Sequence, residues 1–122
     1  MINDIQLEKA AHWWATHLKK SGNIKKENLF SGFYMSDSFE SFGEDEEKIF
    51  EKELLSLLKK ACKNLQGYSL VVHYQPCDIL LKALRNASIE LNRIHLPNKT
   101  VMTINNEKVE VSQNNENFYE IK

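Results

Sequence analysis

Glycine, proline and cysteine are all scarce in this chain of 122 residues, which contains four Gly, two Pro and two Cys. The glycine-rich patterns GxxxxGKS/T and GxGxxG are both missing, which excludes phosphate-binding loops of those kinds. Cys62, Cys77 and the four histidines show none of the CxxC, HxxxH or HExxH spacings that are typical of metal sites. We therefore expect neither a metal ion nor another cofactor.

Long apolar runs are missing as well, and none approaches the roughly 18 residues that a membrane-spanning helix needs. The N-terminal segment MINDIQLEKA lacks the basic and apolar regions of a secretory signal. Apolar residues form 42% of the chain and charged residues 27%, as in soluble globular proteins. A chain of this length can bury a core without disulfides. We expect one domain over residues 1–122, in the cytoplasm and away from membranes.

The formal net charge is only −1, but the charges are unevenly distributed along the chain. Residues 37–53 carry eight acidic and two basic side chains, whereas residues 54–108 carry eight basic and three acidic ones. This pattern argues against general nucleic-acid binding through bulk charge. It is compatible with one charged patch that faces one partner.

The first helix is predicted over residues 4–20. Asn3 is a suitable N-cap, and Gln6, three residues further on, would complete a capping box. Gly22 is suited to the position just beyond the C-terminal end of the helix.

Two further helices are predicted from apolar residues at helical spacing. The clearest pattern covers residues 44–64, with acidic residues at the positive N-terminal end and lysines near the negative C-terminal end. Pro76 is expected to open the last helix, over residues 77–87, where its missing N–H costs little.

The strands fall in the second half of the chain. Residues 68–74 form the first, and its continuous apolar run 70–72 indicates that both faces are covered. Residues 101–104 and 108–112 read as a hairpin, and residues 118–121 as a last strand. The expected fold is α+β, with a small, largely antiparallel sheet of three or four strands packed against two or three helices.

Two adjacent tryptophans stand on the first predicted helix. Trp14 belongs to its apolar stripe, whereas Trp13 lies about 125° from the centre of that stripe, beside His17 at i+4. Tryptophan is enriched in binding hot spots, so Trp13 and His17 are a candidate partner-binding pair. The alternative is that the aromatic segment 29–42, expected to be an ordered loop, covers Trp13.

A run of acidic residues opens the predicted helix 44–64. These side chains match the helix dipole, and they are also candidates to hold a divalent cation or to mimic nucleic-acid phosphates. The run consists of Glu44, Asp45, Glu46 and Glu47.

Lysines gather after the first helix and at the end of the second. If these helices pack antiparallel, the two groups lie far apart, and either could contact RNA with an aromatic side chain for stacking. The first group is Lys19, Lys20, Lys25 and Lys26, and the second is Lys59, Lys60 and Lys63.

Cys77 is the one candidate nucleophile. It follows Pro76 at a predicted helix N-terminus, where the helix dipole favours a thiolate, and His73 lies four residues earlier. A small cysteine-dependent enzyme using Cys77 and His73 is therefore an alternative, although the sequence suggests no third residue to orient the histidine.

The segments KAAHWWATHLKK and HLPNKTVMTINNEKVEVS, with the amphipathic helix between them, resemble small accessory proteins of phages and prophages. Some of those proteins are anti-defence inhibitors, including anti-CRISPR proteins. The resemblance implies a non-enzymatic inhibitor that binds a host defence protein in the host cytoplasm, such as a CRISPR effector nuclease or its guide-RNA complex. A cysteine-dependent enzyme and a direct RNA-binding protein remain alternatives.

Overall fold

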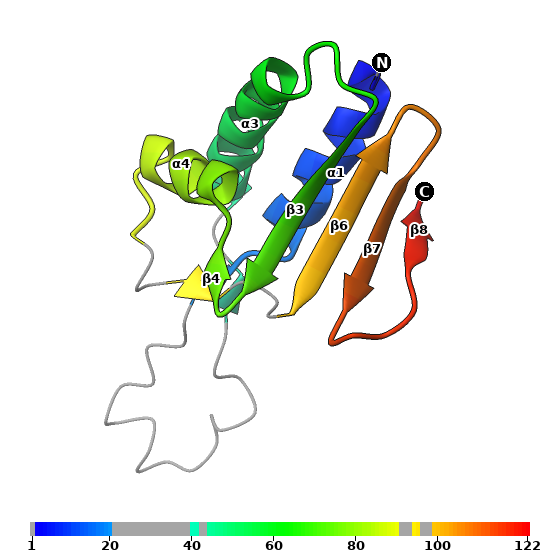
Figure 1. Ribbon diagram of the computed structural model, residues 1–122. Coiled ribbons are helices and arrows are strands. Elements are labelled where there is room, and N and C mark those ends of the chain that lie inside the picture. The colour runs from blue at the N-terminus through cyan, green and yellow to red at the C-terminus, as the bar shows by residue number, and fades with distance from the viewer. Residues whose placement is uncertain (1, 21–39, 42–43, 91–93, 96–98) are drawn as a thin grey trace, which may run out of the picture.

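The computed structural model describes residues 2–20, 40–41, 44–90, 94–95 and 99–122. Within them, three helices pack on one face of an antiparallel sheet (Figure 1), which confirms the predicted α+β class. The helices are α1 (Asp4–Thr16), α3 (Glu44–Ala61) and α4 (Asp78–Asn86).

The main sheet has five strands in the order β4-β3-β6-β7-β8, and each neighbouring pair is antiparallel. The predicted hairpin and the last strand are confirmed. The two-residue strand β4 was not predicted, and it brings the sheet to five strands. The strands are β3 (Gly67–His73), β4 (Gln75–Pro76), β6 (Thr100–Asn105), β7 (Val109–Gln113) and β8 (Tyr119–Ile121).

A second, smaller sheet joins distant parts of the chain. Its order is β2-β1-β5, and both of its pairings are antiparallel. The three strands are β1 (Lys19–Lys20), β2 (Glu40–Ser41) and β5 (Ile94–His95).

The core lies between the helices and the helix-facing side of the main sheet. Alternate strand residues point into it, and β3 pairs Leu70 with Met102 of β6, which in turn pairs with Val111 of β7. All three are fully buried, as are Trp14 of α1 and Phe50 of α3. Burying a side chain of this size contributes about 1.5–3 kcal/mol relative to leaving it exposed.

The prediction that both faces of the first strand are covered is wrong. Leu70 and Val72 are buried, but Val71 between them is 37% exposed. The helices cover one face only, because successive strand residues point to opposite sides of the sheet.

The first helix ends earlier than predicted, at Thr16 instead of residue 20. His17 is its C-cap, Leu18 is fully buried, and Lys19 begins β1, where the backbone pairs with two other strands. Strand pairing thus takes the place of the last helical turn. Gly22, predicted to follow the helix, lies outside the described residues.

The capping box forms in only one direction. The Asn3 Oδ1 accepts a hydrogen bond of 3.0 Å from the Gln6 N–H, as predicted for an N-cap. The reciprocal bond is missing, because the buried Gln6 Oε1 has no hydrogen-bond partner in the described structure.

Pro76 does not open the last helix. It lies in β4, opposite Val72, and Cys77 is the N-cap of α4 without a side-chain hydrogen bond. Tyr74 makes the tight turn from β3 to β4 with a φ of 69°.

The helix predicted over 44–64 ends at Ala61, because residues 62–64 form a turn before β3.

Candidate functional site

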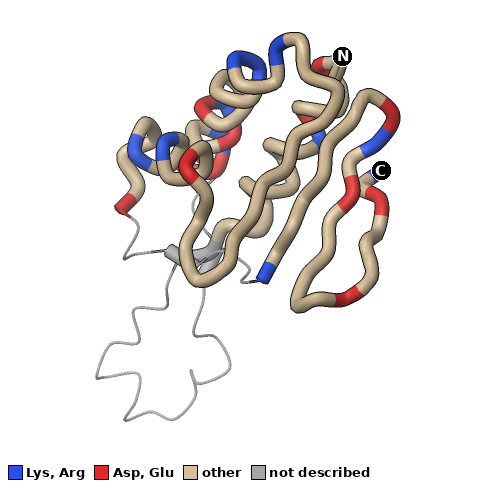
Figure 2. Tube along the Cα trace, in the orientation of Figure 1, with Lys and Arg blue, Asp and Glu red and all other residues tan. Residues whose placement is uncertain are grey.

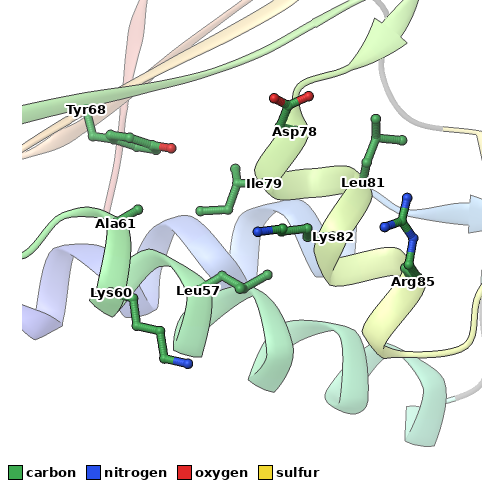
Figure 3. A pocket seen from close by; sticks show the side chains of 9 residues that line it. All are labelled: Leu57, Lys60, Ala61, Tyr68, Asp78, Ile79, Leu81, Lys82 and Arg85. Carbon is green, nitrogen blue, oxygen red and sulfur yellow. The ribbon is translucent and has the colours of Figure 1, made fainter.

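A pocket of about 570 Å³ lies between α3, α4 and the start of β3 (Figure 3). Ligand pockets in proteins commonly enclose about 300–1,000 Å³, so it can hold a side chain or a small ligand. Its lining combines apolar side chains with a phenol, three cationic groups and one carboxylate. The residues are Leu57, Lys60, Ala61, Tyr68, Asp78, Ile79, Leu81, Lys82 and Arg85.

Helical spacing explains why α4 lines the pocket with charged groups. Asp78, Lys82 and Arg85 are related by i+4 and i+3, so they share one face of the helix. Leu80 and Leu84 are buried in the core on another face. The amphipathic pattern that docks α4 on the core therefore also aligns its charged residues beside α3.

The remaining lining comes from the end of α3 and the start of β3. Figure 3 shows the Tyr68 hydroxyl and the Lys82 ammonium group directed into the space between the strand and the helices, and Lys60 directed away from the strand. Figure 2 shows basic residues along α4 and at the C-terminal end of α3. Lys60, Lys82 and Arg85 are called the basic cluster below.

The basic cluster is not neutralised from within the described part of the chain. Among the described residues, no carboxylate oxygen lies within ion-pairing distance of these three side chains, and the ion pairs found there lie elsewhere. Asp78 is the single carboxylate among the described lining residues. Three cationic groups and one anionic group give the pocket a positive character, which favours an anionic ligand.

The environment of Tyr68 raises the pKa of its hydroxyl above 10.0. Burial is the main cause, and the anionic forms of Cys62, Cys77 and Asp78 add to it by opposing a further negative charge. Tyr68 therefore remains a neutral hydrogen-bond donor at the side of the pocket, suited to an acceptor oxygen of a ligand.

The structure buries Trp13, so it is not presented as an exposed partner contact. The side chain is only 6% exposed, its ring packs edge-to-face on Trp14 at 4.9 Å, and it stacks on His17 at 3.9 Å. The His17 Nδ1 lies 2.7 Å from the Trp13 carbonyl oxygen and donates to it. The segment 29–42, proposed to cover Trp13, falls mostly outside the described residues.

The acidic run at the start of α3 is partly described. Asp45 and Glu46 are exposed and Glu47 is half-buried, while the side chain of Glu44 lies outside the described part. Among the described residues, no group of three or more His, Cys, Asp or Glu could hold a metal ion. The run therefore offers negative surface at the helix N-terminus, where the dipole favours it.

Helices α1 and α3 run in opposite directions (Figure 1), so β1, which follows α1 and contains Lys19 and Lys20, lies far from the C-terminal end of α3 with its three lysines. Lys59, Lys60 and Lys63 are all exposed, and of the three only Lys60 is among the described residues that line the pocket. Lys19 and Lys20 form β1, but their side chains are outside the described part, as are Lys25 and Lys26 altogether.

The structure shows no contact between Cys77, the proposed nucleophile, and His73, the proposed base, among the described interactions. The His73 ring packs against Tyr74 at 4.5 Å, and the Cys77 N–H donates to the Val71 carbonyl at 3.0 Å. In the described structure no hydrogen bond joins the His73 ring to the Cys77 thiol.

Sequence reasoning missed Tyr68, Lys82 and Arg85 as site residues. The spacing of Asp78, Lys82 and Arg85 on one helix face was a usable signal. The proximity of that face to Lys60 was not predictable, since it depends on how α4 packs beside α3.

No protein-family model matches this chain, and the curated proteins contain no significant match to it. No helix in the described residues is both long and apolar enough to cross a membrane.

Proposed function

We propose that this chain is a non-enzymatic binding protein that captures an acidic segment of a larger partner protein at the basic cluster. The observation that carries the proposal is that Lys60, Lys82 and Arg85 line one pocket without neutralising partners in the described structure. The apolar floor, which includes Leu57 and Ile79, suits the rest of a peptide segment.

The resemblance to phage accessory proteins extends this proposal to the target. The partner is then a host defence protein, such as a CRISPR effector nuclease or its guide-RNA complex, and binding would inhibit it. An inhibitor of this kind needs no catalytic group, because occupying a functional surface of the target is sufficient.

The test compares the native chain with the double variant Lys82→Glu/Arg85→Glu in pull-downs from host lysate. Lys52→Glu is a control for reversing a surface charge, since Lys52 is exposed in the middle of α3 and does not line the pocket. We expect a partner that the native chain and the control retain and the double variant loses. If every retained protein binds the double variant equally well, the basic cluster is not the contact surface and the proposal is wrong.

Cleavage assays with a panel of CRISPR effectors test the narrower target. The native chain should block at least one effector, and the double variant should need about tenfold more protein, as expected for losing about 1.4 kcal/mol of charge-assisted binding. If no effector is blocked, the CRISPR version of the proposal is wrong, while the pull-down still tests the binding function.

Direct RNA binding is a second candidate, favoured by the position of Tyr68 beside the cations of the basic cluster. An aromatic ring next to basic side chains is a common platform for single-stranded nucleic acid. A gel shift at low and high salt distinguishes this candidate, because phosphate-driven binding weakens steeply as salt rises.

A further inference from the structure

The outer edge of β3 is open over most of its length. The short strand β4 pairs only with Val72 and His73, and no other strand in the described residues pairs with this edge over residues 67–71. On its other side β3 pairs with β6 over residues 67–72. An open strand edge is a template for another extended chain.

One hydrogen bond fixes the direction of the peptide groups along this edge. The Cys77 N–H donates to the Val71 carbonyl at 3.0 Å, so the peptide groups of Val71 face the outer edge. In an antiparallel ladder the N–H and C=O of one residue point to the same side, and alternate residues repeat that direction. The N–H and C=O of Ser69 therefore also face outward, where no described strand pairs with them.

The pocket lies beside this edge, on the helix-facing side of the sheet. Tyr68, next to Ser69, belongs to the face that carries Leu70 and Val72, and its side chain lines the pocket. Residues paired across two strands point to the same face. In a strand added next to β3, the residue opposite Tyr68 would thus point toward the pocket and the basic cluster.

We propose that the partner binds as an added strand on the open edge of β3, with one Asp or Glu side chain entering the pocket. This inference rests on the proposed function and specifies how the acidic segment is held. Main-chain hydrogen bonds to Ser69 supply affinity, and the basic cluster selects the acidic residue. A nucleic acid cannot satisfy the Ser69 peptide groups in this way, so the geometry favours a peptide.

The length of the open edge sets the length of the segment. Because Cys77 already lies beside Val71 on this edge, positions 67–70 accommodate roughly four residues of an added strand. Residues of this segment that point away from the pocket would lie over the open sheet face, next to the exposed Val71. The expected pattern is therefore an acidic residue flanked by β-branched residues at alternate positions.

The experiment pans a phage-displayed library of random peptides against the full chain. We expect enriched peptides that share one acidic position within an extended, β-branched pattern. A synthetic copy of the enriched peptide is then titrated against the native chain and its variants. Failure to enrich any peptide, or enrichment without an acidic position, overturns the inference.

Ser69→Pro tests the strand contact. It removes the outward N–H, and proline is tolerated at edge positions whose N–H does not serve the sheet, so the fold should survive. We expect about tenfold weaker peptide binding, as for one lost main-chain hydrogen bond that leaves its partner unpaired. A peptide N-methylated at the pairing position should lose binding similarly, and this test does not depend on the folding of any variant.

The outcomes distinguish failure of strand addition at β3 from failure of acidic-segment binding at the basic cluster. If Lys82→Glu weakens the peptide but Ser69→Pro and N-methylation do not, the basic cluster binds the segment without strand addition, and this inference is wrong. If Lys82→Glu and Lys52→Glu bind the peptide equally well, the proposed function itself fails. Slowed hydrogen exchange at the Ser69 amide in the native complex would support strand addition directly, and unchanged exchange there would oppose it.

Discussion

The Trp14 indole donates its Nε1–H to the Met102 Sδ across 3.2 Å, between residues 88 positions apart in the chain. The contact joins α1 to β6, and both side chains are fully buried. The tryptophan thereby satisfies its only polar group while filling the space between the helices and the sheet. This pair holds the N-terminal helix on the face of the sheet where the core forms.

Replacing Trp14 by Ala should destabilise the protein by about 3–5 kcal/mol, because it leaves a large cavity under α1. Trp14→Phe should cost less, since the ring volume is partly retained. Urea unfolding followed by circular dichroism gives both values. Equal stability of Trp14→Ala and the native chain would contradict the packing described here.

Trp13→Ala should also lower stability, by about 3 kcal/mol, because Trp13 is buried between Trp14 and His17. His17→Ala should cost about 0.5–1.5 kcal/mol through the lost ring stacking. Thermal unfolding and partner pull-down are measured on the same samples. If Trp13→Ala abolished binding at native stability, Trp13 would instead be a contact residue.

Gln6→Met should stabilise the protein by about 1 kcal/mol. The buried Gln6 Oε1 has no hydrogen-bond partner in the described part of the structure, and removing such a group relieves its desolvation cost. Asn3→Ala is a control of opposite sign and should cost about 1 kcal/mol through loss of the N-cap. Lower stability of Gln6→Met would mean that the amide oxygen has a partner.

Burial raises the pKa of the Cys62 thiol from 9.0 to about 11. The folded protein then keeps this proton at pH values where the unfolded chain releases it, so stability should fall as pH rises from about 9 to about 11. Unfolding measured across this range should show a smaller decline in Cys62→Ala. An equal decline in both proteins would assign the effect to other groups.

Iodoacetamide labelling of the folded chain tests the two thiols separately. Cys62 is 1% exposed and should resist labelling, whereas the half-buried Cys77 should react at the slow rate of an ordinary thiol. Peptide mass spectrometry identifies the labelled site. Unusually fast reaction of Cys77 at neutral pH, lost in His73→Ala, would revive the cysteine-dependent alternative.

Local patterns were sufficient for most of the elements. The period-3.6 stripe that includes Phe50, Leu54 and Leu58 predicts α3, and the alternation of Val109 and Val111 with polar residues predicts β7. Both signals arise because one side of each element faces the core. The errors fall where a competing contact intervenes, as at Lys19, whose backbone joins a sheet instead of extending α1.

The candidate site was predictable only in part. Lys60 stands in a visible run of lysines, and Lys82 and Arg85 share a helix face by spacing alone. Nothing local brings them together with Tyr68, because these residues come from α3, α4 and β3. The burial of Trp13 could not be predicted from the sequence either, because Trp13 lies outside the apolar stripe of α1 that contains Trp14.

The sequence by itself determined the α+β class, the three helices, the β6–β7 hairpin and the burial of Trp14, because these follow from local periodicity and side-chain chemistry. Only the tertiary structure decided that Trp13 is buried, that no described strand pairs with most of one edge of β3, and that three cationic side chains line one pocket. These features depend on packing between segments far apart in the chain, and hydrophobic periodicity specifies which face of an element is buried but not what lies opposite it.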